Sequence, residues 1–144
     1  MMVRIELMEW SRARAEATRI RFAVFVEEQH VPTEIEMDEM EARCVHAVAH
    51  SADGEAVATG RLLPDGHIGR MAVLKEWRGQ GIGGEILERL TAAARERGDA
   101  EVALSAQTHA LAFYRRHGFS EEGEVYEEAG ILHQMMRRVL TRQL

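Results

Sequence analysis

The sequence holds little cysteine, little proline and no long apolar run, and each shortage excludes a class of protein. The single cysteine, Cys44, cannot form a disulfide within the chain and is expected to be a small core residue. The N-terminal residues MMVRIELMEWSRAR lack the uninterrupted apolar run of a signal peptide, and no stretch approaches the ~20 apolar residues that span a bilayer. We therefore expect a cytoplasmic protein that does not enter the membrane.

Prolines and repeats give no sign of a second domain. Pro32 and Pro64 lie too far apart to mark a linker, and the sequence contains no internal repeat or low-complexity segment. A chain of 144 residues with 46% hydrophobic residues can fill one core without disulfides or a structural metal. Residues 1–144 are therefore expected to form a single domain.

Basic residues are outnumbered, with 18 Lys and Arg against 24 Asp and Glu, which gives a net charge of −6. Because the basic residues are also scattered, nucleic-acid binding is not expected. His46 and His50 lack the pattern of a helical metal site, so no metal is expected. An acidic segment without Lys or Arg could attract a cationic amine or could simply be solvated. It contains Glu27, Glu28, Glu34, Glu36, Asp38, Glu39 and Glu41.

Alternation and periodicity predict strands and helices in a mixed order. Val3, Ile5 and Leu7 alternate with the residues between them and predict a first strand, and helical spacing favours a helix over residues 11–28, before a loop over residues 30–41. Tight turns join the next three predicted strands, which implies an antiparallel meander. These strands cover residues 44–50, 56–63 and 68–74. Further helices are predicted over residues 85–97 and 108–117, and further strands over residues 102–105, 119–126 and 131–140.

A glycine-rich loop, Arg78-Gly79-Gln80-Gly81-Ile82-Gly83-Gly84, lies between a predicted strand and a predicted helix. Free N–H groups at such a helix start can receive phosphate oxygens, so the loop predicts an anion site. It is not a Walker A loop, because Glu85 stands where that motif needs a lysine. The spacing G-x-G-x-x-G is met, but an antiparallel meander precedes it, which argues against a dinucleotide fold.

A third pattern, [RQ]-x-x-G-x-[GA], is met by Arg78, Gly81 and Gly83, and here the sequence resembles the GNAT superfamily of N-acetyltransferases. The resemblance extends to Met71-Ala72-Val73, to Trp77 and to the run Ala110-Leu111-Ala112-Phe113-Tyr114-Arg115-Arg116-His117-Gly118-Phe119. The segments Val24-Phe25-Val26-Glu27-Glu28-Gln29, Glu36-Met37-Asp38 and Gly60-Arg61-Leu62-Leu63 are similar to the ElaA-like subgroup. The resemblance implies an α/β fold of the α+β type, the GNAT fold, with a mixed, mostly antiparallel central sheet flanked by helices.

The resemblance also implies acetyl-CoA as the co-substrate. In the family, the pyrophosphate rests on the amides of the glycine loop, and the pantetheine arm lies like an extra strand beside the strand before the loop. The residues that inherit these roles are Met71, Ala72, Val73, Arg78, Gly79, Gln80, Gly81, Ile82, Gly83 and Gly84. Gln107 stands where the family has an asparagine that contacts the cofactor. The apolar members of this set could equally be core residues.

The catalytic residues also follow from the resemblance. Tyr114 matches the position that usually protonates the CoA sulfur, although an aromatic side chain there could simply pack on its helix. Glu28, His109 and His133 are candidates for the general base. The expected reaction is direct attack by a primary amine on acetyl-CoA in a ternary complex. The alternative is a regulatory domain that binds acyl-CoA without turnover.

The acceptor and the oligomeric state are less defined by the sequence. In the family, the region of the acidic segment borders the acceptor cleft, where it could attract an amine. The acceptor could be a small molecule or an amine of a peptide or protein. Residues 131–140 could supply an edge strand for a homodimer, because unpaired strand edges invite pairing.

Overall fold

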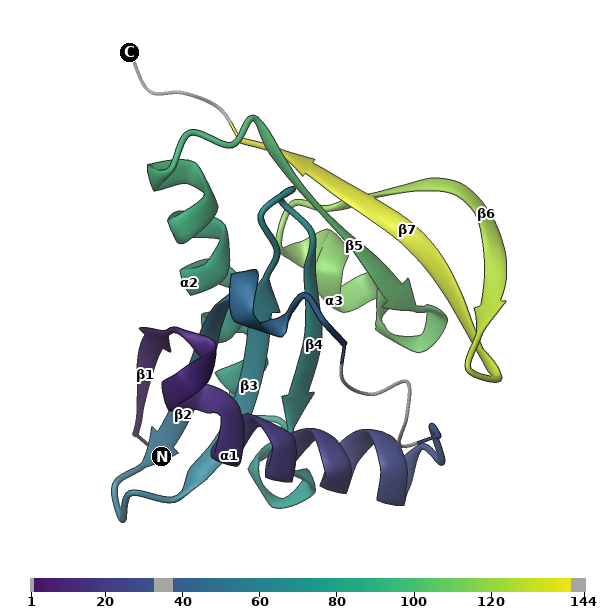
Figure 1. Ribbon diagram of the computed structural model, residues 1–144. Coiled ribbons are helices and arrows are strands. Elements are labelled where there is room, and N and C mark those ends of the chain that lie inside the picture. Colours follow the sequence, from purple (N-terminus) through teal and green to yellow (C-terminus); the bar gives the residue numbers. More distant parts are fainter. Residues whose placement is uncertain (1, 33–37, 141–144) are drawn as a thin grey trace.

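The structure is a computed structural model, which describes residues 2–32 and 38–140 (Figure 1). Glu34 and Glu36 of the acidic segment lie outside the described residues. In chain order the elements are β1 (Val3–Met8), α1 (Trp10–Arg21), the π-helical segment η1 (Phe22–Glu28), the 3₁₀ turn η3 (Glu41–Arg43), β2 (Val45–Ser51), β3 (Ala56–Leu62), β4 (Ile68–Val73), the 3₁₀ turn η4 (Lys75–Trp77), α2 (Ile82–Glu96), β5 (Glu101–Gln107), the 3₁₀ turn η5 (Thr108–Ala110), α3 (Leu111–Arg116), β6 (Ser120–Glu128) and β7 (Ile131–Val139). This order confirms the predicted alternation of strands and helices.

The N-terminal strands form a four-stranded antiparallel sheet in the order β1-β2-β3-β4, which confirms the predicted meander. Successive residues of β2 contribute to two different apolar clusters. Ala47 and Ala49 belong to the cluster that includes α2, whereas Val48 belongs to the cluster that includes α1. Because side chains alternate along a strand, α1 and α2 cover opposite faces of this sheet (Figure 1).

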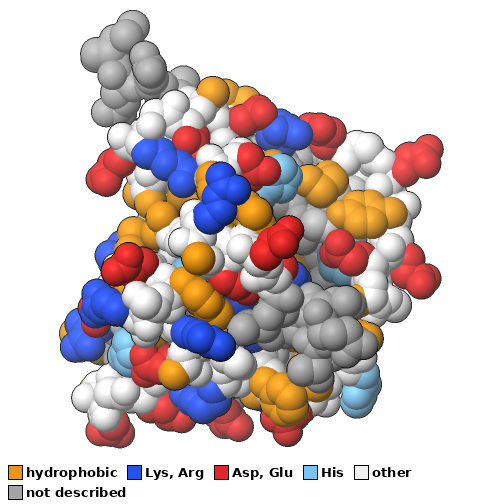
Figure 2. Space-filling view, in the orientation of Figure 1, with side chains coloured by type: hydrophobic (Ala, Val, Ile, Leu, Met, Phe, Trp, Pro, Cys, Tyr) orange, Lys and Arg blue, Asp and Glu red, His pale blue; other side chains and the backbone are white. Residues whose placement is uncertain are grey.

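The C-terminal strands form a separate three-stranded antiparallel sheet in the order β5-β7-β6. β7 lies in the middle of this sheet, so the expectation that residues 131–140 supply an edge for a homodimer is wrong. The outer edge belongs to β6, whose mostly exposed side chains include several glutamates, and Figure 2 shows acidic side chains on the side of the molecule where Figure 1 places this strand. The strand pattern in the sequence showed that both segments are strands but did not show which one pairs on both sides.

The two sheets meet at β4 and β5 and then diverge. One parallel bridge, between His67 and Ala103, joins them just before β4 begins. On the other edge of β4, the pairing with β3 shifts register, from Thr59 opposite Ala72 to Arg61 opposite Gly69. Such a bulge bends the bulged strand. Together the two sheets make the mixed, mostly antiparallel β-structure flanked by helices that the sequence predicts.

The three predicted helices differ from the observed ones in their geometry or limits. In the helix predicted over residues 108–117, the first three residues form the 3₁₀ turn η5 and α3 covers only Leu111–Arg116. The helix predicted over residues 11–28 is continuous, but it changes from α-helical to π-helical at Phe22. The helix predicted from residue 85 begins three residues earlier, so Ile82, Gly83 and Gly84 belong to its first turn rather than to the loop. Within the described ranges, none of the helices has both the length and the apolar composition that crossing a bilayer requires.

Candidate functional site

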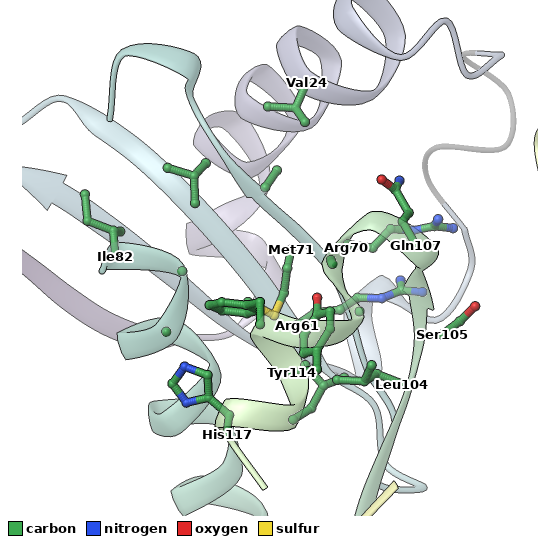
Figure 3. Close-up of a pocket in the computed structure, with 18 of the residues that line it drawn as sticks. Val24, Arg61, Arg70, Met71, Ile82, Leu104, Ser105, Gln107, Tyr114 and His117 are labelled. Carbon is green, nitrogen blue, oxygen red and sulfur yellow. The ribbon is translucent and has the colours of Figure 1, made fainter. Parts of the chain in front are cut away.

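A cleft of about 1620 Å³ opens where the two sheets diverge, and β4, the start of α2, the end of β5, α3 and the turn between β6 and β7 supply its wall (Figure 3). Nearly all of the predicted site residues line it: Met71, Ala72, Val73, Arg78, Gly79, Gly81, Ile82, Gly83, Gly84, Gln107, His109, Tyr114 and His133. Gln80 and Glu28 do not. Residues far apart in the sequence therefore share one space, as the resemblance implies.

β4 presents an open edge to this cleft. One edge of β4 pairs with β3, and past the bridge at His67 the other edge has no strand partner among the described residues. The backbone N–H and C=O groups of Met71, Ala72 and Val73 therefore border the cleft on a strand edge. An extended chain with amide groups, such as a pantetheine arm, can pair with such an edge.

The start of α2 forms a cradle of backbone amides. Gly81 caps the helix with a left-handed backbone, φ 82°, which a residue with a side chain adopts at a cost. The first intrahelical bond runs from the N–H of Glu85 to the carbonyl of Gly81, at 3.1 Å. The N–H groups of Ile82, Gly83 and Gly84 come before this bond in the chain, so the helix supplies no carbonyl to which they can donate. They suit a pyrophosphate group, and this is the chemistry that the glycine loop predicts.

Arg78 ties this loop to its surroundings. Its Nε donates to the carbonyl of Val73 at 2.9 Å, and its two terminal nitrogens donate to the carboxylate of Glu28 at 3.0 and 2.7 Å. Glu28 therefore has both carboxylate oxygens occupied and stands outside the cleft lining. The structure places this candidate base in an ion pair that links η1 to the glycine loop.

Tyr114 lies on α3 with its hydroxyl directed into the cleft (Figure 3). Its ring packs edge-on against Phe113, with ring centres 5.0 Å apart, and against Phe119, with ring centres 6.1 Å apart. Burial raises the pKa of Tyr114 to about 12, and the hydroxyl has no hydrogen-bond partner among the residues described. The side chain is thus both packed and available as a proton donor at neutral pH.

His133 and His109 differ in how they are held. His133 is buried on β7, where its Nδ1–H donates to the carbonyl of Ile131 at 2.7 Å. Because a carbonyl can only accept, Nδ1 carries a proton, and Nε2 lies 3.7 Å from a carboxylate oxygen of Glu128. The ring also stacks on Tyr126. His109 is exposed on η5 without a hydrogen bond to any described residue.

Gln107 is engaged by a residue that the sequence did not single out. The side-chain amides of Gln107 and Gln29 bond reciprocally, at 3.0 and 3.2 Å, and both residues line the cleft. This pair links the end of η1 to the end of β5. Gln29 falls within the segment similar to the ElaA-like subgroup, but no motif indicated its partner 78 positions away.

Two described residues of the acidic segment, Asp38 and Glu41, are paired with arginines of this chain rather than free to attract an amine. Asp38 accepts two hydrogen bonds from Arg61, at 2.8 and 2.7 Å, and these lower the pKa of Asp38 to about 2. Glu41 is buried and pairs with Arg21 at 2.6 Å and with Arg61 at 3.0 Å. Burial accounts for the pairing, because a buried carboxylate requires a cationic partner.

Comparison with known proteins agrees with this geometry. Residues 12–140 match the family model described as "Acetyltransferase (GNAT) domain". YjcF of Bacillus subtilis, named as an N-acetyltransferase, is 42% identical over 128 residues, which cover 85% of this chain and 90% of that protein. An acyl-CoA N-acyltransferase from Pseudomonas aeruginosa has a TM-score of 0.85 at 33% identity, and the match covers 96% of this chain and 100% of that chain. Escherichia coli ElaA has a TM-score of 0.84 at 29% identity, and the match covers 95% of this chain and 99% of that chain. The chain is therefore a member of the GNAT family of N-acetyltransferases.

Proposed function

We propose that this protein transfers the acetyl group of acetyl-CoA to a primary amine by direct attack within a ternary complex. The observation that carries this proposal is the cleft itself, where an open strand edge, a cradle of helix amides and the hydroxyl of Tyr114 share one space. The acyl-CoA N-acyltransferase from P. aeruginosa, at 33% identity, supports an acyl-CoA donor. The amine belongs to a small molecule or to a peptide or protein.

Backbone groups bind the donor, and the side chain of Tyr114 acts in the chemical step. Backbone groups of β4 pair with the pantetheine arm, and the amides of Ile82, Gly83 and Gly84 bind the pyrophosphate. Tyr114 donates its hydroxyl proton to the thiolate that leaves as the amine nitrogen bonds to the acetyl carbon. Its raised pKa keeps that proton in place across the neutral range.

His133 is the general base that the geometry favours among the three candidates. His133 lines the cleft, and its Nδ1–H bond to a carbonyl makes Nε2 of the neutral ring the atom that accepts the proton that the amine loses. Glu28 is held by Arg78, and the exposed ring of His109 has no group that orients it. An oriented base is more effective than a rotating one.

The test compares the tyrosines Tyr114 and Tyr126. A panel of primary amines is screened for thiol release from acetyl-CoA, and the best acceptor is used with the variants Tyr114→Phe and Tyr126→Phe. We expect Tyr114→Phe to lower kcat by at least about tenfold and to leave acetyl-CoA affinity, measured by calorimetry, nearly unchanged. Tyr126 does not line the cleft, and Tyr126→Phe keeps the ring that stacks on His133 while it removes only a hydroxyl bonded to Ser105 and Met135, so it should retain the rate.

Two outcomes would contradict the proposal. An unchanged rate in Tyr114→Phe would remove this residue from the mechanism. Saturable acetyl-CoA binding without thiol release for any amine would favour the non-catalytic alternative.

The base is tested separately with His133→Gln and His109→Gln. Protonation of a catalytic histidine lowers the rate at acid pH, so kcat/KM of the wild type should fall on that side. We expect His133→Gln to lower kcat/KM by at least about tenfold and to abolish this fall, whereas His109→Gln retains both. The pKa of Tyr114 near 12 predicts no loss of rate on the alkaline side up to about pH 10. The opposite pattern in the two variants would assign the base to His109.

A further inference from the structure

Arg70 is a charged residue of the cleft wall that no motif in the sequence indicated. It lies on β4 directly before Met71, so it stands at the end of the open strand edge that is farther along the chain from the glycine loop. In Figure 3, Arg70 and Gln107 lie on one side of Tyr114, and Ile82 and His117 lie on the other. The cleft therefore extends beyond Tyr114, away from the amide cradle of α2.

The backbone of Arg70 is strained. Its φ of 50° lies in the left-handed region, which a residue with a side chain adopts at a cost, and here it does so within a strand. The register shift between β3 and β4 falls at the same point, so Arg70 and Met71 together stand opposite the single residue Gly60. Strain of this kind concentrates at binding and catalytic sites. The conformation therefore indicates a role for Arg70 in the cleft.

Asp38 joins Arg70 to a second arginine of the cleft wall, Arg61 on β3. Arg61 is only 6% exposed, and the Nε–H of this buried side chain has no hydrogen-bond partner among the described residues. Both carboxylate oxygens of Asp38 accept hydrogen bonds from Arg61, and one of them also lies 3.5 Å from Nη2 of Arg70. Two guanidinium groups on neighbouring strands therefore share one carboxylate at the cleft.

The surroundings of Arg70 favour an anion. Burial and the nearby guanidinium of Arg61 lower the pKa of Arg70 below its usual value, and the carboxylates of Asp38 and Glu41 oppose this change without reversing it. The positive charge of Arg70 is therefore held at a cost, and an anion brought against it is stabilised.

Other carboxylates of the cleft wall are more exposed. The side chains of Asp65 and Glu128 are 64% and 62% exposed, so solvent screens their charges. The side chain of Arg70, by contrast, is 30% exposed. Its charge is therefore felt more strongly by a group bound in the cleft.

We infer that Arg70, with the positive charge of Arg61 beside it, binds a carboxylate of the acceptor, so that the preferred acceptor is a small amine that carries a carboxylate, as amino acids do. This inference rests on the proposed function and names its acceptor class. Arginine suits the role, since its planar fork pairs with two carboxylate oxygens at once. An acceptor held there lies on the side of Tyr114 away from the pyrophosphate cradle, so donor and acceptor do not compete for the same part of the cleft.

The test uses pairs of acceptors that differ only in the charge at one end: β-alanine, γ-aminobutyrate and ε-aminocaproate, each compared with its own amide. Thiol release from acetyl-CoA gives kcat and KM for every acceptor, and the three pairs vary the separation between amine and carboxylate. In at least one pair, kcat/KM of the wild type should be at least about tenfold higher for the carboxylate than for the amide, which is the usual effect of a charge-assisted hydrogen bond.

Variants of Arg70 test whether this residue sets the preference. Arg70→Gln should bring the ratio of the two kcat/KM values toward one, mainly by raising KM for the carboxylate, and Arg70→Lys should keep part of the preference because it keeps the charge. Arg70→Gly should also bring the ratio toward one, and it does not force a side chain into a positive φ, so it should fold. Calorimetric titration with acetyl-CoA checks that each variant is folded.

A matched control is Arg95→Gln, which removes the same charge from an exposed site near the far end of α2, outside the cleft lining. It should keep the full preference for the carboxylate. The inference would be overturned if Arg95→Gln lost the preference as much as Arg70→Gln, or if Arg70→Gln kept it.

The wild type separates failure of this inference from failure of the proposed function. Thiol release that is equal or faster with the amide in all three pairs would overturn the carboxylate site and leave the proposed function standing. The same conclusion would follow if other primary amines were acetylated but no member of these pairs was. Absence of thiol release with every primary amine would instead contradict the proposed function itself.

Discussion

The two sheets of this molecule differ in how much of them is covered. Every residue of β3 in the four-stranded sheet is buried, whereas β6 in the three-stranded sheet is exposed along most of its length. α1 and α2 enclose the first sheet from both sides, and β6 is an open edge of the second. Stability is therefore expected to depend mainly on the four-stranded sheet, while the cleft lies at the boundary, where both sheets contribute wall residues.

The largest effect is expected from the buried charges beside the four-stranded sheet. Glu41→Gln leaves Arg21 and Arg61 without their shared carboxylate in a buried setting, which should cost about 3–5 kcal/mol of unfolding free energy. Glu121→Gln breaks the exposed pair with Arg115 at the edge of the other sheet and should lower the unfolding free energy much less, because solvent screens an exposed ion pair. Urea unfolding measures both variants. Similar losses would show that the two sheets are equally sensitive.

A second contrast uses leucines from the two regions. Leu90→Ala opens a cavity where α2 packs on the four-stranded sheet and should cost about 2–5 kcal/mol. Leu132 on β7 is 52% exposed, so Leu132→Ala should cost less than about 1 kcal/mol. Thermal and urea unfolding of the two variants test this. A large loss for Leu132→Ala would point to a partner that covers β7.

A third prediction concerns pH. Hydrogen bonds from Arg61 lower the pKa of Asp38 from 3.8 to about 2, so this carboxylate stabilises the fold above pH 4 and loses its effect as pH falls toward 2. Asp38→Asn should cost about 1 kcal/mol at pH 7, less than the full shift implies, because solvent screens a carboxylate that is about one-third exposed. The difference in unfolding free energy between Asp38→Asn and wild type should fall by about half near pH 3. Urea unfolding of both proteins from pH 7 to pH 3 measures this difference, and a difference that stays constant would contradict the prediction.

The smallest effect is expected at the outer edge. Val125 on β6 is 49% exposed, and Val125→Ser should change the unfolding free energy by less than about 0.5 kcal/mol. It should also leave thiol release unchanged, because Val125 does not line the cleft. A marked loss of activity or stability would mean that β6 makes a contact in solution that this chain alone does not show.

Local patterns in the sequence were enough to predict much of the architecture. Alternation marked the strands, glycine positions marked the start of α2, and the motif around Tyr114 marked a residue that lines the cleft. These features depend on neighbours within a few positions, where periodicity and backbone preference act directly. The same reasoning started α2 too late, because glycines weaken a helical pattern even where they form its first turn.

Partners distant in the sequence were decided only by the tertiary structure. Glu28 meets Arg78 across 50 positions and Gln29 meets Gln107 across 78, so no local pattern identifies either pair. The central position of β7 in its sheet and the pairing of Asp38 with Arg61 also depend on segments distant in the sequence, so local patterns did not predict them. Hydrophobic periodicity indicates which face of an element is buried, but packing of the whole chain decides what that face meets.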